Sequence, residues 1–185
     1  MRSMVLEFTE DRTCHYADRQ YMLGDNLLVA PIFNEEGMAD YYLPAGKWTD
    51  FFTGEVKEGG RWIQEKHGYL SVPLLVKEGS IVALGAHDDK PDYDYGDGVE
   101  LRIYELQDGV AASTVVYGMD QSEEVKVSAV RNGNTVTVDV ASDKAYTVRL
   151  MNVAATGVEG TETATDGKDT IVKSASGHMV CTINE

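Results

Sequence analysis

Three aspartates near glycines form the segment most able to hold a metal ion. Asp92, Asp94 and Asp97 are close enough in sequence for their carboxylates to surround Ca²⁺. The EF-hand pattern fails, however, because Gly96 stands at the fifth position from Asp92 and Ile103, rather than glutamate, stands at the twelfth. We therefore interpret the segment as a solvated acidic linker and expect no metal site in it.

The other residues with metal-binding or nucleophilic chemistry are scattered along the chain. The histidines are too far apart in sequence for a zinc site, and neither cysteine belongs to a CxxC pattern. These residues are His15, His67, His87, His178, Cys14 and Cys181. The spacing supports no Ser-His-Asp or Cys-His arrangement, and the glycines fall at strand ends rather than in a phosphate loop. We expect two free thiols, no cofactor, and no catalytic, substrate-binding or metal-ligating residue.

A group of aromatic residues could bind carbohydrate, because the C–H face of a pyranose packs well on an aromatic ring. The group consists of Tyr41, Tyr42, Trp48, Phe51, Phe52, Trp62 and Tyr69. The competing interpretation is that half of these rings fill a sheet core and the others pack against another part of the protein. Alternation along the chain favours core positions for Tyr42, Trp48 and Phe52.

The charge of the chain argues against two classes of partner. Its 185 residues include 16 Lys and Arg against 31 Asp and Glu, which gives a formal net charge of −15. Such a chain is repelled by the phosphates of nucleic acids and by an anionic membrane surface. A spanning helix is also excluded, because no run of about 18 apolar residues is present. We expect neither nucleic acid nor membrane as a partner.

The hydrophobic pattern of the first half predicts short elements. Met4–Phe8 has the apolar run of a buried strand, and Tyr16–Leu23, closed by Gly24, suits a short helix. Leu27–Phe33 is a continuous apolar run, which is typical of a strand buried on both faces. Residues 40–44 and 47–52 predict an aromatic-rich hairpin, and further strands are expected at 61–65, 70–76 and 80–84.

The second half alternates more cleanly and follows an acidic, Pro- and Gly-containing segment at His87–Gly98, which we interpret as a linker. Residues 125–129 and 136–140 predict a hairpin that turns at Arg131–Asn134. Other strands are expected at 99–104, 146–150, 170–172 and 179–183. Short strands at this spacing indicate an all-β fold with two consecutive antiparallel β-sandwich domains, at residues 21–95 and 96–185.

Several blocks, in order, resemble the glycoside hydrolases of family 31. The run Asp18–Pro31 is similar to a family signature that lies just past the last strand of the catalytic (β/α)8 barrel. Tyr42–Asp50 and Val72–Ser80 resemble successive parts of the domain that follows the barrel. The resemblance extends to Gly109, and beyond that point only a generic distal β-sandwich is indicated. Shorter blocks resemble the α-xylosidase branch, at residues 83–85, 90–93 and 105–109.

The resemblance implies that residues 1–20 are the last strand and a short helix of a truncated (β/α)8 barrel. Retaining α-glycosidases hold two carboxyl groups about 5–5.5 Å apart. In this family both come from the middle barrel strands, which would precede Met1, so we expect this chain to lack the catalytic pair. Glu7, at the carboxyl end of the inferred strand, could face the active site or form a capping or salt-bridging contact. Asp25 is expected to bind backbone N–H groups of a turn.

The favoured function is that of the noncatalytic C-terminal β-sandwich region of a retaining, α-xylosidase-like α-glycosidase. Its partners would be the missing catalytic barrel of its parent chain and, through that barrel, an α-linked oligosaccharide. The alternative is a free-standing carbohydrate-binding module that uses the aromatic group. A small complete enzyme is least favoured, because no set of acid and base residues can be named. The unpaired cysteines and the α-xylosidase resemblance favour a cytoplasmic location.

We predict that the chain by itself hydrolyses neither aryl α-xylosides nor aryl α-glucosides, because it lacks both nucleophile and proton donor. The measurement is release of the aryl alcohol by highly purified chain. Turnover that disappears when one of the chain's own acidic residues is substituted would contradict the prediction.

Overall fold

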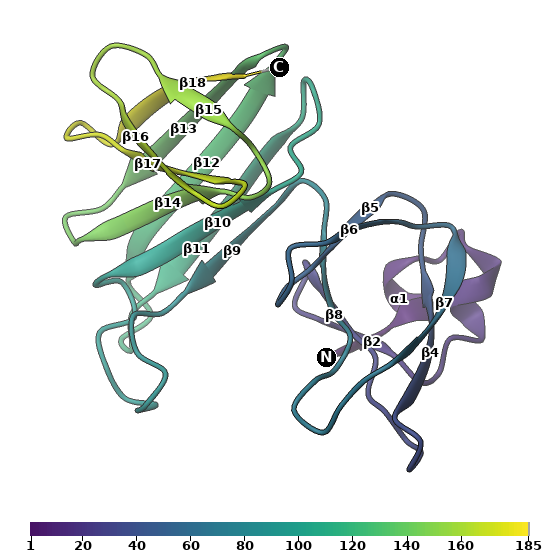
Figure 1. Cartoon of the computed structure of the whole chain (residues 1–185). Helices are drawn as coiled ribbons and strands as arrows, with labels where there is room; N and C mark the ends of the chain where they lie inside the picture. The colour runs from purple at the N-terminus through teal and green to yellow at the C-terminus, as the bar shows by residue number, and fades with distance from the viewer. Residues whose placement is uncertain (185) are drawn as a thin grey trace. The chain divides into compact units, whose positions relative to one another are not determined.

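The computed structural model describes residues 1–184, which are mostly β-structure (Figure 1). The chain folds into two compact units, Met1–Glu78 and Gly79–Glu185. This division lies earlier in the chain than the sequence-based boundary between residues 95 and 96. No helix in the described part of the chain is long and apolar enough to cross a membrane.

The first unit combines a six-stranded sheet with a two-stranded one. The larger sheet has the strand order β1-β2-β3-β8-β5-β6, and β4 pairs with β7 in the smaller sheet. The strands are β1 (Arg2–Ser3), β2 (Tyr21–Leu23), β3 (Leu27–Val29), β4 (Met38–Leu43), β5 (Lys47–Asp50), β6 (Val56–Glu58), β7 (Arg61–Lys66) and β8 (Leu74–Lys77). Two short helices precede β2, namely α1 (Met4–Glu7) and the 3-10 helix η1 (Arg12–His15).

The predicted strand at Met4–Phe8 is wrong, because its first four residues form helix α1. The turn is closed by the Phe8 N–H, which donates to the Met4 carbonyl at 2.9 Å. Met4 is fully buried, whereas Leu6 is 70% exposed. Burial on one side only suits a single helical turn, since one residue in about four faces the core.

The predicted helix at Tyr16–Leu23 is also wrong. Its last three residues form β2, which pairs with β3 through a tight turn where Gly24 has a φ of +65°. Gly24 therefore enables a hairpin turn rather than ending a helix. The following strand is shorter than Leu27–Phe33 predicts, because β3 ends at Val29 and Phe33 is exposed.

The predicted hairpin at residues 40–52 does not form, although both of its strands exist. β4 pairs with β7, whereas β5 pairs with β6 and β8. The chain changes sheets at Pro44–Gly46, where Gly46 has a φ of +116° and the Trp48 indole N–H donates to the Pro44 carbonyl at 2.8 Å. Phe52 is 63% exposed, so the expected core position is wrong for this ring.

The second unit consists of two five-stranded sheets that lie face to face in Figure 1. Their orders are β16-β17-β14-β10-β9 and β11-β12-β13-β18-β15. The strands are β9 (Ser80–Leu84), β10 (Val99–Tyr104), β11 (Ala111–Tyr117), β12 (Glu123–Asn132), β13 (Thr135–Ala141), β14 (Tyr146–Leu150), β15 (Ala155–Gly157), β16 (Glu162–Asp166), β17 (Asp169–Lys173) and β18 (His178–Ile183). Both sheets contribute to one core that includes Leu101, Val138, Val148 and Met179.

Sequence alternation predicts this unit well. The expected strands at 80–84, 99–104 and 146–150 have the observed bounds, and β12 and β13 form the expected hairpin. Three features differ from the prediction. No strand was expected at β11. β10 pairs with β14 in parallel, and β9 pairs with β10, so the segment His87–Gly98 is a loop within the second unit rather than a linker between domains.

We predict that Gly59→Ala destabilises the first unit by about 2–4 kcal/mol. A Cβ at this position would lie 1.8 Å from the Pro44 carbonyl oxygen, so the backbone would have to shift. Gly68→Ala is the matched control, since nothing lies within 4 Å of its Cβ position and its φ is not positive. Urea unfolding followed by tryptophan fluorescence checks both variants. Equal stability of the two variants would contradict the prediction.

Candidate functional site

Glu7 and Asp25 share one cationic partner, Arg2. The Arg2 guanidinium lies 3.2 Å from a Glu7 carboxylate oxygen, makes an ion pair with Asp25, and donates to the Gly24 carbonyl at 3.0 Å. Arg2 thus connects helix α1 to the β2–β3 turn. Glu7 takes the salt-bridging position, and the Asp25 carboxylate binds the guanidinium rather than the backbone N–H groups expected from sequence.

The acidic loop at Asp92–Asp97 is neutralised by a lysine. Lys144 Nζ lies 2.6 Å from Asp94 and 2.8 Å from Glu124, and the Gly96 N–H donates to both carboxylates. The hydrogen bond from Lys144 holds the pKa of Asp94 below its ordinary value. An ammonium group therefore occupies the position that a metal ion would need, and no metal-binding cluster of His, Cys, Asp or Glu is found among residues 1–184.

The histidines and cysteines do not come together either. His15 contacts the Thr9 carbonyl, His87 packs edge-on against Tyr93, and His178 contacts Asp139. Both cysteines are free and buried. Burial, followed by the nearby Asp11 carboxylate, raises the pKa of the Cys14 thiol to about 12, so this thiol is unreactive at neutral pH.

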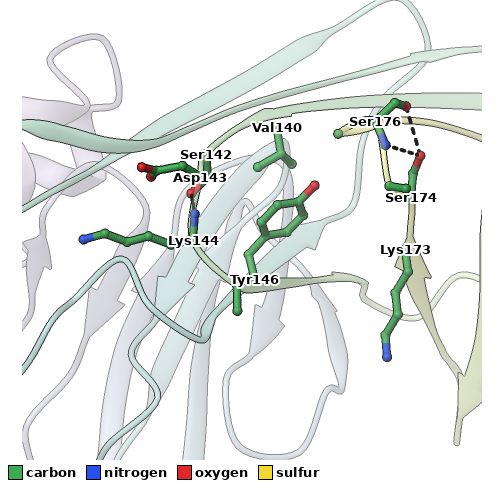
Figure 2. A pocket seen from close by; sticks show the side chains of 11 residues that line it. Val140, Ser142, Asp143, Lys144, Tyr146, Lys173, Ser174 and Ser176 are labelled. Atoms are coloured by element: carbon green, nitrogen blue, oxygen red, sulfur yellow. Dashed lines mark hydrogen bonds between the residues drawn. The ribbon is translucent and has the colours of Figure 1, made fainter.

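A hollow of about 360 Å³ lies between the β13–β14 and β17–β18 turns of the second unit (Figure 2). Ser174 and Ser176 form a hydrogen bond beside it, and the Tyr146 ring forms part of its wall. In Figure 2 the amines of Lys144 and Lys173 extend away from the Tyr146 ring. The Lys144 amine is bound to Asp94 and Glu124, so it is not free for a ligand in this hollow.

A second hollow of about 360 Å³, which we call the Trp62 pocket, lies in the first unit. It is lined by Tyr16, Ala17, Asp18, Arg19, Gln20, Asp40 and Trp62. Two walls come from different parts of the chain, the segment at residues 16–20 and the β4–β7 sheet. The volume lies within the range of about 300–1,000 Å³ that is usual for small-molecule sites.

The Gln20 side chain fixes one wall of the Trp62 pocket to the other. Its amide donates to the Tyr42 carbonyl at 2.7 Å, and its oxygen accepts from the Tyr42 N–H at 2.7 Å. Both backbone groups of Tyr42 therefore point away from β7, which makes Tyr42 and Trp62 a non-hydrogen-bonded cross-strand pair. Side chains of such pairs lie close together, and the centroids of the Tyr42 and Trp62 rings are 5.7 Å apart.

The exposed side chains of the Trp62 pocket combine an aromatic face with polar groups. The Trp62 side chain is 54% exposed, and Tyr16 is also exposed. Asp40 lies on the same face of the sheet as Trp62 and accepts a hydrogen bond from Gln64. Among residues 1–184, the side chains of Asp18 and Arg19 have no ion-pair partner. Such a surface can stack on a ring and exchange hydrogen bonds with it.

The aromatic group predicted from sequence divides between core and surface. Tyr41, Tyr42 and Trp48 are buried, whereas Phe52, Trp62 and Tyr69 are exposed. The ring contacts join Tyr42 with Trp62 and Phe51 with Phe52, so they do not link all seven rings. Sequence reasoning missed Tyr16, Asp18, Arg19 and Asp40. The polar triplet at residues 18–20, inside a segment interpreted as a short helix, was the available signal.

The other face of the β4–β7 sheet carries a polar cluster around Glu65. Its carboxylate accepts from Tyr41 Oη at 2.7 Å and Lys57 Nζ at 2.6 Å, and it lies 3.1 Å from His67 Nε2. His67 Nδ1 lies 2.6 Å from Ser71 Oγ, so a neutral imidazole can donate to Glu65 and accept from Ser71. The spacing of these residues in the sequence did not reveal this chain of hydrogen bonds. Because the Glu65 carboxylate already accepts hydrogen bonds from Lys57 and Tyr41, we interpret the cluster as structural.

Comparison with known proteins identifies both units. The model described as "Glycosyl hydrolase family 31 C-terminal domain" matches residues 1–82, and "Alpha-xylosidase YicI, C-terminal domain" matches residues 94–184. The chain is 39% identical to α-xylosidase XylQ of Lactiplantibacillus pentosus over 159 residues, which cover 82% of the chain and 21% of XylQ.

Solved structures show the same fold. The GH31 dextranase of Flavobacterium johnsoniae matches the whole chain with a TM-score of 0.77, at 20% identity and over 29% of its own length. The cycloalternan-forming enzyme of Listeria monocytogenes also matches the whole chain, with a TM-score of 0.78, at 23% identity and over 20% of its own length. The chain therefore spans between a fifth and a third of the length of these relatives.

We predict that Glu65→Gln makes the chain less stable at neutral pH and less sensitive to acid. Burial raises the pKa of Glu65, but hydrogen bonds from Lys57, Tyr41 and His67 outweigh burial and hold it below its ordinary value. A carboxyl with a lowered folded pKa stabilises the fold above its unfolded pKa, and this stability is lost as the pH falls through the folded value.

The measurement is the free energy of unfolding in urea between about pH 7 and pH 3. The wild-type value should fall in the acid part of this range more than that of Glu65→Gln. The exposed Glu36 provides the matched control, since Glu36→Gln should follow the wild-type curve. An identical acid dependence for Glu65→Gln and wild type would count against the cluster's role.

Proposed function

The chain belongs to glycosyl hydrolase family 31 as its C-terminal domains, and we propose that these domains are a noncatalytic support for a catalytic (β/α)8 barrel. The parent enzyme would be a retaining, α-xylosidase-like α-glycosidase. The observation that carries this proposal is the tandem match of two different C-terminal domain models, at residues 1–82 and 94–184. A free-standing carbohydrate-binding module is less favoured, because both matches are to C-terminal domains of larger enzymes.

The finer architecture is part of the proposal. We take the two units as consecutive β-sandwiches, with residues 1–20 as the end of the barrel. Hydrolysis then takes place on an α-linked oligosaccharide held by the barrel, since retaining hydrolysis needs two carboxyl groups held about 5–5.5 Å apart. Glu7 and Asp25 instead share Arg2. The two free, buried thiols fit a reducing compartment, and we propose a cytoplasmic location.

The first elements of the chain offer a surface for the barrel. Met1, which precedes β1, Val5 and Leu6 of α1, and Leu23 of β2 are exposed apolar residues. Burying each Leu-sized side chain is worth about 1.5–3 kcal/mol. β1 stands at the end of its sheet in the described strand order, so its free edge can pair with another strand. These features suit a barrel as the occupant, because they combine apolar surface with an unpaired strand edge.

We predict that this chain can replace the matching C-terminal fifth of α-xylosidase XylQ. The chimera should hydrolyse aryl α-xylosides, whereas XylQ ending before that segment should be inactive or insoluble. Leu6→Glu in the chimera should lower its melting temperature, because a carboxylate would be buried against the barrel. Leu70→Glu is the matched control, since Leu70 is exposed in the same unit but lies outside α1.

Two outcomes would contradict the proposal. One is an inactive but folded chimera. The other is an equal melting temperature for the Leu6→Glu and Leu70→Glu chimeras, which would show that α1 does not face the barrel.

A further inference from the structure

We propose that the Trp62 pocket is a noncatalytic binding site for one neutral sugar ring. The Trp62 indole would stack on the C–H face of the pyranose, and Asp18, Arg19 and Asp40 would exchange hydrogen bonds with its hydroxyl groups. All of its lining residues lie within the first unit, so both of its walls are present in this chain.

The first argument is that the pocket is preorganised. Gln20 is buried and holds residues 16–20 against β4 through both of its amide atoms. Tyr42 packs against the Trp62 ring, and the Tyr42 hydroxyl donates to Asp11 at 2.9 Å. Asp11 also accepts from the Thr13 N–H at 3.0 Å, at the start of η1. A ring held by such contacts loses little side-chain entropy when a ligand binds.

The second argument is the combination of an available aromatic face with unpaired polar groups. An exposed indole binds C–H groups through its apolar area and the negative charge of its face. Asp18 and Arg19 are exposed at the pocket, and within residues 1–184 Asp40 is bound by the Gln64 amide alone, at 3.3 Å, so carboxylate acceptors and guanidinium donors remain for hydroxyl groups. The hollow beside Tyr146 lacks this combination, because no exposed aromatic residue lies among its lining residues.

The third argument concerns the charge of the ligand. Two carboxylates in the pocket and a chain charge of −15 disfavour an anion. Arg19 in the same lining disfavours a cation, which the indole and the carboxylates alone would attract. A neutral polyol ring satisfies all of these groups. The narrower class, an α-xyloside or α-glucoside, rests on the proposed function.

The test is a titration of the full chain with methyl α-xyloside, methyl α-glucoside and choline, followed by ligand-observed saturation-transfer NMR. We expect saturable millimolar binding of at least one glycoside, which corresponds to about 4 kcal/mol. The chain has two tryptophans, and Trp48 is buried, so a change in tryptophan emission on binding would report on Trp62. Trp62→Ala should weaken glycoside binding by about tenfold or more, the effect of losing one aromatic contact and its buried area.

Two further variants keep the test decisive. Trp62→Phe should retain part of the binding, because a phenyl ring preserves a smaller aromatic face. Phe52→Ala removes an exposed ring outside the pocket and should bind as wild type does. Buried Trp48 provides a check, through its emission, that each variant is folded.

The proposal is overturned if no glycoside saturates, if Trp62→Ala binds as wild type does, or if choline binds more tightly than either glycoside. These outcomes are distinct from failure of the proposed function. Leu6→Glu, which tests the contact with the barrel, lies outside the pocket and should leave glycoside binding by the chain unchanged.

Discussion

In the first unit, much of the architecture depends on how the backbone of β4 is satisfied at the edge that does not face β7. A buried N–H or C=O group without a partner costs about 1–3 kcal/mol. Gln20 supplies partners for both groups of Tyr42. The same two bonds hold residues 16–20 over one face of the sheet, so Tyr41, Tyr42 and Leu43 are all buried although consecutive strand residues face opposite sides.

This dependence also explains which elements the sequence predicts. In the second unit several strands, such as β12 and β13, carry their own alternation, and the hairpin of β12 and β13 turns at Gly133, whose φ is +59°. Such signals are local, so they can be recognised in the sequence without knowing which strand is the partner. The start of the first unit has no local signal of this kind, since helix α1 and the pairing of β4 with β7 are decided by contacts distant in sequence.

The residues of the candidate site also fall into two groups, those that the sequence could point to and those that only the structure brings together. Trp62 and its aromatic neighbours stand out by residue type alone, and a carbohydrate surface could be considered from them. Asp18 and Arg19 could not be added, because their segment was interpreted as a helix, and it is the contacts of Gln20 with Tyr42 that place it beside Trp62. The cluster of Glu65, Lys57 and His67 was missed for the same reason, since its members meet only through the β4–β7 register and the loop that follows β7.

The electrostatics of the chain agree with the supporting role proposed for it. A glycosidase needs a general acid whose pKa is raised toward neutral pH. Three carboxyls of this chain shift the opposite way, because nearby donors lower the pKa values of Glu65, Asp94 and Asp120. Other carboxylates pair with Arg2 and Arg149. Glu65, Asp94 and Asp120, which these donors hold ionised, stabilise the fold but are poor proton donors, in agreement with the proposal that the general acid comes from the barrel.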